Sequence, residues 1–152
     1  MTHSRAMIGL LALLAAHAVP ATAAADEMLP DPAFAQSAMA GEWWATQNVE
    51  LEYQAGALCG LVAGGTANPW DAILGLNGLS LRKGEHYRLS VTVSGDPGGP
   101  MRALAQQGED PWTPEGEIVR RLSPDKQTAN EDFTAGESHD PAQLTFQLGG
   151  AD

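Results

Sequence analysis

The sequence has few basic residues and almost no cysteine. Eight Lys and Arg stand against 19 Asp and Glu, which gives a formal net charge of −11. Nucleic acids and anionic membranes are bound by clustered Lys and Arg, so we expect neither as a partner. Cys59 is the only cysteine in 152 residues, so no disulfide can form within this chain. In an exported protein, a lone cysteine indicates a bridge to another chain, a thiol without a bridge or a missing partner.

Motifs for catalysis and metal binding are also missing. The sequence contains no G-x-S-x-G elbow, no H-E-x-x-H motif and no phosphate-binding loop. His86 and His139 have no second ligand at metal spacing. Glycosidases hold two carboxylates about 5–10 Å apart across the substrate, a separation that a sequence does not give for Asp110, Glu115 and Glu117. We therefore expect no catalysis by this domain itself and no cofactor.

Residues 1–25 have the pattern of a secretory signal peptide. Arg5 lies in a short n-region, an apolar run extends to Val19, and small residues fit cleavage after Ala23 or Ala25. The run is shorter than the ~20 apolar residues of a membrane span, and no later segment approaches that length. We expect a secreted protein, extracellular or periplasmic, with one mature domain at 26–152.

Alternation of polar and apolar residues dominates the mature sequence. In HYRLSVTVS (86–94) the apolar residues are Tyr87, Leu89, Val91 and Val93, and in AQLTFQL (142–148) they are Leu144, Phe146 and Leu148. This period of two predicts strands with one buried face. The other predicted strands are Val49–Tyr53, Ala57–Ala63, Ala72–Leu76, Met101–Gln106, Ile118–Leu122 and Gln127–Thr134. Gly-containing turn signals at 63–65, 77–78, 83–84 and 95–100 separate them, which predicts an all-β sandwich.

The placement of the tryptophans suggests a binding surface. Trp43 and Trp44 are adjacent, so only one of them can face the core if they lie on a strand. Trp70 and Trp112 each follow a proline, in NPWD and DPW. An exposed indole offers a flat apolar face and a hydrogen-bond donor, which suits a sugar ring. The alternative is that Trp43 packs inside and the other indoles cover hydrophobic surface.

Polar residues on the predicted strands support the same hypothesis. Gln143 and Gln147 are four residues apart and point the same way along one strand, and Arg102 lies on the wetter face of another. Amides and a guanidinium supply the donors and acceptors that recognition of hydroxyl groups requires. Taken alone, such residues are ordinary on an exposed sheet. Together with peripheral tryptophans they indicate a groove.

Four segments, in this order and spacing, resemble the CenC-type carbohydrate-binding modules of families 4 and 9. They are GALCGLVAGG, LNGLSLRKGEHYRLSVTVS, MRALAQQGEDPW and AQLTFQLGG, and DPAF followed by GEWWAT is similar to the family's opening segment. The resemblance covers residues 31–150. It implies a β-jelly-roll sandwich with a cleft for a single glycan chain. Members are non-catalytic modules of bacterial endoglucanases, other glucanases and xylanases.

The resemblance also implies which residues contact the sugar. An arginine of the V-R-A-L strand, a glutamine and an aromatic shortly after it, and two glutamines of the last segment line the family's cleft. A cleft tyrosine of some members aligns with Thr46, and the neighbouring Trp44 is expected in its place. The predicted carbohydrate-binding residues are Trp44, Trp70, Asn77, Arg102, Gln107, Trp112, Gln143 and Gln147.

One departure from the family lies at the C-terminus. The family continues with a strand whose cysteine pairs with the one at the position of Cys59 and whose aspartates help to hold a structural calcium. This sequence stops at GGAD. We therefore expect a jelly roll that lacks its last strand, with no disulfide at Cys59, an open sheet edge beside it and marginal stability.

The expected function is that of a secreted, non-catalytic carbohydrate-binding module. It would hold a chain of β-glucan (cellulose-like, mixed-linkage or β-1,3) or xylan and keep an attached enzyme near polysaccharide. One alternative is the N-terminal fragment of a glycoside hydrolase, such as an endoglucanase acting on glycosyl bonds. A second is a structural or adhesive β-sandwich without a sugar site, in which the tryptophans would be buried.

Overall fold

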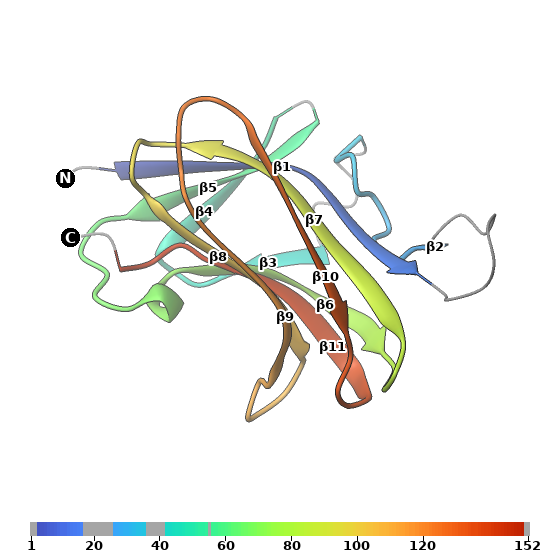
Figure 1. The fold of residues 1–152 in the computed structure, drawn as a ribbon. Coiled ribbons are helices and arrows are strands. Elements are labelled where there is room, and N and C mark those ends of the chain that lie inside the picture. The colour runs from blue at the N-terminus through green and yellow to red at the C-terminus, as the bar shows by residue number, and fades with distance from the viewer. Residues whose placement is uncertain (1–2, 17–25, 36–41, 55, 151–152) are drawn as a thin grey trace.

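Two antiparallel β-sheets packed face to face make up the domain (Figure 1). The computed structural model describes residues 3–16, 26–35, 42–54 and 56–150. One sheet, called the β7 sheet, has the order β10-β7-β1-β5-β4, and β2 pairs with β1. The other, called the β11 sheet, has the order β3-β6-β11-β8-β9. The prediction of an all-β sandwich is confirmed.

The strands are short and follow one another closely. Those of the β7 sheet are β1 (His3–Ala16), β2 (Asp26–Glu27), β4 (Val49–Gln54), β5 (Ala57–Ala63), β7 (His86–Gly95) and β10 (Gln127–Thr134). Those of the β11 sheet are β3 (Trp43–Ala45), β6 (Ile73–Leu81), β8 (Pro100–Gln107), β9 (Pro114–Arg121) and β11 (His139–Gln147). A 3-10 turn, η2 (Pro69–Asp71), precedes β6. In the part of the chain that the structure describes, no helix could cross a membrane.

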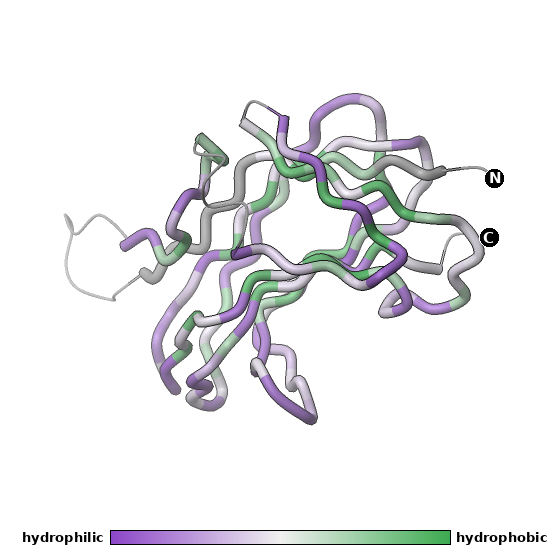
Figure 2. Tube along the Cα trace, turned by 180° about the vertical axis from the view of Figure 1, so that it is seen from behind, coloured by the Kyte–Doolittle hydropathy of each residue, from purple (hydrophilic) through white to green (hydrophobic). Residues whose placement is uncertain are grey.

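Alternating apolar residues of both sheets meet in the core. Leu89 and Val91 of β7 and Leu144 and Phe146 of β11 are completely buried, as the period of two predicts. Figure 2 shows hydrophobic and hydrophilic residues succeeding one another along the chain. Each such side chain contributes about 1.5–3 kcal/mol when it leaves water, so this layer holds the sheets together.

The predicted turn at 77–78 is wrong. β6 runs through both residues from Ile73 to Leu81, and its pairing with β11 shifts register between Leu76 and Leu79. Gly78 has a φ of 81°, a left-handed conformation that glycine adopts without a Cβ clash. Asn-Gly here forms a bulge inside a strand, which bends the strand without ending it.

Residues 3–16, expected to belong to a signal peptide outside the fold, form strand β1. This strand lies between β5 and β7 and pairs antiparallel with both. Ala6 and Ile8 point into the core, where they are 4% and 0% exposed. The backbone groups of this apolar segment form hydrogen bonds to a neighbouring strand on each side, as expected of a strand in the middle of a sheet.

The expected open edge beside Cys59 is therefore wrong for the full chain. Cys59 lies on β5 opposite Met7 of β1 on one side and Glu52 of β4 on the other. Its side chain is buried, with 6% exposed. The segment that covers β5 comes from the N-terminus, a placement that strand periodicity alone does not reveal.

Candidate functional site

An open groove of about 610 Å³ crosses the outer face of the β11 sheet. Three indoles, a proline, apolar side chains and a row of polar side chains surround it. Six of the eight predicted site residues line the groove, namely Trp44, Trp70, Arg102, Trp112, Gln143 and Gln147. The other lining residues are Ile73, Leu104, Gln106, Pro114 and Thr145.

Two neighbouring strands form the floor of the groove. Gln143, Thr145 and Gln147 alternate along β11 and lie opposite residues of β8. The cross-strand pairs are Gln143 with Gln106, Thr145 with Leu104 and Gln147 with Arg102. Because side chains on one face of a strand recur every second residue, these pairs present one polar row to the groove.

The polar side chains of the floor are unusually buried. The exposed fractions are 5% for Gln106, 6% for Gln143, 1% for Thr145 and 9% for Gln147. The Thr145 Oγ1 atom has no hydrogen-bond partner among the residues that the structure describes. A buried hydroxyl without a partner costs free energy, so a ligand that bonds to it gains affinity.

Trp44 forms one wall from the edge strand β3. It lies opposite Gly75 of β6, and a Cβ atom at Gly75 would stand only 2.6 Å from the indole carbon Cζ2. The indole Nε1 of Trp44 donates a hydrogen bond of 2.9 Å to Oδ1 of Asn77. Asn77 does not line the groove, so it positions Trp44. The preceding Trp43 packs toward the core, with its ring centroid 6.3 Å from that of Phe146, so only one of the two adjacent indoles faces inward.

Trp70 stands on the 3-10 turn η2 and is 57% exposed. The carboxylate of Asp71 accepts hydrogen bonds from the backbone N–H groups of Ala67 (3.0 Å) and Asn68 (2.8 Å), which closes the turn. The N–H of Gly149 donates to the Pro69 carbonyl at 3.1 Å. The residues after β11 thus fix the turn that carries Trp70.

Trp112 lies in the loop between β8 and β9. Its side chain is 52% exposed and its φ is 51°, which is rare for a residue with a Cβ. Its N–H donates to the Glu109 carbonyl at 2.7 Å, and the N–H of Gly108 donates to the Pro141 carbonyl at 2.9 Å. These contacts hold the indole out over the groove.

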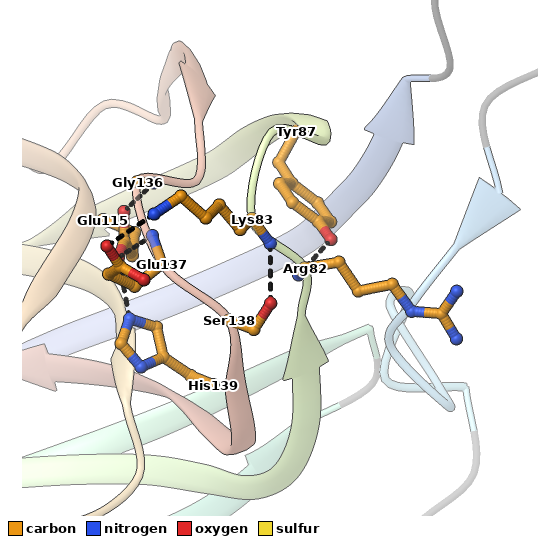
Figure 3. Close-up of polar contacts among 8 residues, drawn as sticks. All are labelled: Arg82, Lys83, Tyr87, Glu115, Gly136, Glu137, Ser138 and His139. Carbon is orange, nitrogen blue, oxygen red and sulfur yellow. Dashed lines mark hydrogen bonds and ion pairs between the residues drawn. The ribbon is translucent and has the colours of Figure 1, made fainter.

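Glu115 ties the start of β9 to the turn between β10 and β11 (Figure 3). Its carboxylate accepts hydrogen bonds from the N–H groups of Gly136 (2.7 Å) and Glu137 (3.2 Å), and it contacts Nε2 of His139 at 2.7 Å. The side chains of Glu115 and His139 are each 8% exposed. Pro114 lines the groove and directly precedes Glu115, so this cluster fixes the start of β9 beside the groove.

The hydrogen bonds to Glu115 also shift its acidity. Burial alone raises the pKa of this carboxyl group, because the charged form loses water. The bonds from Gly136, His139 and Glu137 favour the charged form and outweigh burial, so the pKa lies below its ordinary value of 4.5. The carboxylate is therefore a structural anchor that stays ionised at neutral pH.

Arg102 lies in the groove between two polar partners. Its Nε donates to Oε1 of Glu117 on β9, and its Nη1 lies 3.4 Å from Oε1 of Gln147 on β11. The ion pair fixes the plane of the guanidinium, and several of its five N–H groups remain for other acceptors.

Gln107, predicted to contact the sugar, does not line the groove. Gln106 lines the groove instead, because Arg102, Leu104 and Gln106 share one face of β8 and Gln107 falls on the alternate position. The N–H of Gln107 instead donates to the Thr113 carbonyl at 2.9 Å, closing the loop that carries Trp112. Thr145 was also missed as a site residue, although its position between the two glutamines signalled it.

The structural calcium that the family resemblance suggests has no cluster of acidic side chains in the described part of the chain. Among the residues that the structure describes, no three His, Cys, Asp or Glu side chains gather as metal ligands. The groove itself contains no carboxylate in its lining.

The two-layered fold and the groove with its aromatic rim define the class as that of the carbohydrate-binding β-sandwiches. Residues 36–152 match the family described as carbohydrate binding domain, families 4 and 9. The chain belongs to this family and is a carbohydrate-binding module of that type, with the jelly-roll sandwich predicted for it.

Relatives within the family come from Cellulomonas fimi. Endoglucanase C of that organism is 34% identical over 131 residues, which are 82% of this chain. The chain spans only 12% of that protein's length. The second N-terminal cellulose-binding domain of its β-1,4-glucanase C is 34% identical with a TM-score of 0.62, covering 82% of this chain and 85% of that one.

A further solved structure supports the same assignment. It is described as "CBM4 structure and function" and has a TM-score of 0.66 at 29% identity. It covers 72% of this chain and 83% of that one. The resemblance found in the sequence is confirmed.

Proposed function

We propose that the groove of the β11 sheet binds a single chain of a β-linked polysaccharide and does not cleave it. The preferred ligand is a β-glucan of the cellulose type, with mixed-linkage and β-1,3-glucans and xylan as the other candidates. Support for cellulose comes from the Cellulomonas fimi relative described as a cellulose-binding domain.

The observation that carries the proposal is the buried polar floor beneath exposed indoles. Gln106, Gln143, Thr145 and Gln147 are each 9% exposed or less, whereas Trp70 and Trp112 are more than half exposed. Pyranose rings have apolar faces that stack on aromatic rings and hydroxyl edges that bond to amides and hydroxyls. A groove of this composition is complementary to both surfaces of such a ring.

The same exposure argues against the structural or adhesive alternative. That hypothesis predicts that the tryptophans cover hydrophobic surface and are buried themselves. Trp70 is 57% exposed and Trp112 is 52% exposed, and both indoles line the groove. Two exposed indoles on one groove favour a ligand over a merely structural role.

The acidic residues near the groove favour binding without hydrolysis. No Asp or Glu is among the residues that line it. Glu117 is held by Arg102, and Glu115 is turned into its cluster with His139. Neither carboxylate is therefore arranged as the acid or the nucleophile that cleavage of a glycosidic bond requires.

We also propose that the domain acts beside a glycoside hydrolase after export. The support is the match to a small part of an endoglucanase and the leader-like pattern of residues 1–25. A module that holds polysaccharide raises the effective concentration of substrate for an attached enzyme. N-terminal sequencing of the protein recovered outside the cytoplasm tests export. A start at Asp26 or Ala24 is expected, and an intact Met1 would contradict it. Such a start would remove β1 (His3–Ala16), so the exported domain would be the shorter form without the strand between β5 and β7.

Affinity electrophoresis tests the binding proposal. Native gels containing hydroxyethylcellulose, barley β-glucan, laminarin or xylan should retard the protein, most strongly in the first two. Trp112→Ala should migrate faster than the parent in the gel that retards it, and Arg88→Ala on the opposite sheet should not. Unchanged migration of the folded protein in all four gels would refute binding. Release of reducing ends by the pure protein would refute the non-catalytic assignment.

A further inference from the structure

A second hollow of about 290 Å³ continues the groove at the end remote from Trp112. The two hollows share Arg102 and Gln147, whose side chains lie 3.4 Å apart. Pro69, the first residue of the turn η2 that carries Trp70, lies on one side of the second hollow. Its other side is formed by the end of β9, with Val119, Arg120 and Arg121.

The pairing of β8 with β9 explains this composition. Val119 lies opposite Arg102, and Arg121 lies opposite Pro100. Val119 and Arg121 are two residues apart and therefore share the face of the sheet that carries the groove. Val119 is 59% exposed, so an apolar surface adjoins the guanidinium groups.

Positive charge is concentrated in this hollow although the chain is strongly acidic. Three of the eight Lys and Arg of the whole sequence line it, and none of its lining residues is Asp or Glu. Arg102 is compensated by Glu117. Arg120 and Arg121 form no ion pair in the described part of the chain.

Both of these arginines are also held in place. Nη1 of Arg120 donates to the Val119 carbonyl at 2.7 Å, and Nη1 of Arg121 donates to the Gly98 carbonyl at 3.0 Å. A guanidinium has five N–H groups, so each retains donors for a second acceptor. Its planar fork matches the two oxygens of a carboxylate.

We propose that this hollow binds the carboxylate of a uronic acid unit on a β-linked polysaccharide, while the neutral main chain lies in the groove. The inference rests on the proposed function and adds an acidic branch to its ligand. Glucuronic acid side groups on a β-1,4-xylan have this chemistry: a pyranose ring for Val119 and a carboxylate for Arg121. Arg120 falls on the alternate position of β9, opposite Met101, and adds positive charge to the lining of the hollow. The result is a module that binds an acidic xylan chain more tightly than the same chain without its carboxylates.

Calorimetric titration of the full chain with paired polymers tests the preference. The first pair is glucuronoxylan and the same polymer after its carboxyl groups are reduced to alcohols. At about 20 mM salt we expect the acidic polymer to bind about tenfold more tightly, and most of the difference should vanish at about 0.5 M salt. The double variant Arg120→Gln/Arg121→Gln should bind both polymers equally. The control Arg82→Gln/Lys126→Gln removes the same charge elsewhere and should keep the preference.

Each outcome decides between the two proposals. Equal binding of both polymers by the parent overturns the acidic subsite but leaves carbohydrate binding intact. A preference that survives in Arg120→Gln/Arg121→Gln with a normal melting curve also overturns it. Binding of sulfated cellulose as tight as that of glucuronoxylan would show a general anion site and refute the assignment to a carboxylate. No binding of any glycan would refute the proposed function as well.

Discussion

Polar side chains alternate with buried apolar ones on the strands of both sheets. The polar groups of the two outer faces differ in how completely they are hydrogen-bonded to one another. On the β7 sheet the outward residues pair with one another: Arg88 with Asp132 at 2.6 and 2.9 Å, and Thr92 with Thr128 at 2.9 Å. The Arg88 and Asp132 side chains are 50% and 65% exposed. This face meets water, and its polar groups form contacts among themselves.

The outer face of the β11 sheet is walled in and incompletely paired. Its amides and the Thr145 hydroxyl are nearly inaccessible, and Thr145 Oγ1 lacks a partner in the described residues. The walls come from η2, from β3 and from the loop before β9, which lie far apart in the sequence. A polar strand face becomes a binding site when other segments form walls around it and some of its polar groups keep no hydrogen-bond partner within the protein.

Removing residues 1–25 should change the free energy of unfolding more than any other variant, because it takes β1 out of the β7 sheet. β5 and β7 would lose the strand between them, and Ile8 would leave the core. Burial of one isoleucine alone contributes about 1.5–3 kcal/mol, so the free energy of unfolding should fall by about 3 kcal/mol or more. That is a large share of a typical stability of about 5–15 kcal/mol. Urea unfolding of the full chain and of residues 26–152 measures the difference, and equal midpoints would contradict the role of β1.

Trp112→Ala should weaken binding on the β11 sheet without unfolding it. Loss of one stacking face should cost about 1–3 kcal/mol of binding free energy. The indole is 52% exposed, so the melting temperature should change little. Calorimetric titration with the preferred glycan measures the first effect, and Arg88→Ala is the control on the opposite face. A large drop in melting temperature would show that the indole supports the core.

Glu115→Gln should lower the stability of the protein by an amount that depends on pH. The pKa of Glu115 is lowered by folding, so its contribution to stability is complete above about pH 4.5 and is lost as the pH falls through the folded-state pKa. At pH 7 the variant should lose about 1–2 kcal/mol of unfolding free energy, because it replaces hydrogen bonds to a charged group.

The difference between parent and Glu115→Gln should shrink between pH 5 and pH 3. Asp132, whose pKa is lowered by its hydrogen bond to Arg88, is present in both proteins and cancels from the difference. Chemical unfolding at a series of pH values gives the curve. A difference that stays constant over this range would contradict the ionised state of Glu115.

The smallest expected effect is also the most specific, because stability and binding should change in opposite directions. Thr145→Val replaces the buried hydroxyl without a partner by a methyl group of similar size. Binding should weaken by about 0.5–1.5 kcal/mol, while stability should stay equal or rise by up to about 1 kcal/mol. Thr92→Val on the β7 sheet, where the hydroxyl is paired with Thr128, should leave binding unchanged. Lower stability of Thr145→Val would indicate that the hydroxyl has a structural partner.

Period-two patterns predicted the strands and part of the site. The alternation in β11 identified the buried Leu144 and Phe146 and, on the other face, Gln143 and Gln147 of the groove. The tryptophan after Pro69 was correctly expected at the surface. Strand periodicity predicts which side of a strand a residue occupies, because that side depends only on local geometry.

Other features depend on contacts that the sequence does not encode locally. The pairing of Glu115 with His139 joins the starts of β9 and β11, 24 residues apart, and the strand position between β5 and β7 is filled from the N-terminus. Gly78 carries a turn-like signal but forms a bulge, since β11 continues to pair on both sides of it. Each of these is decided by tertiary pairing. The choice of Gln106 over Gln107, in contrast, follows from local alternation, because Arg102, Leu104 and Gln106 share one face of β8.

The central claim is that the β11 face, and not the β7 face, binds a glycan chain. A titration of the ¹⁵N-labelled protein with a cello-oligosaccharide, followed by NMR, tests it most directly. We expect a joint shift of the side-chain amide signals of Gln106, Gln143 and Gln147 and of the indole signals of Trp44, Trp70 and Trp112. Signals of Arg88 and Thr92 should stay in place. Shifts confined to the β7 face, or none with any β-linked oligosaccharide, would contradict it.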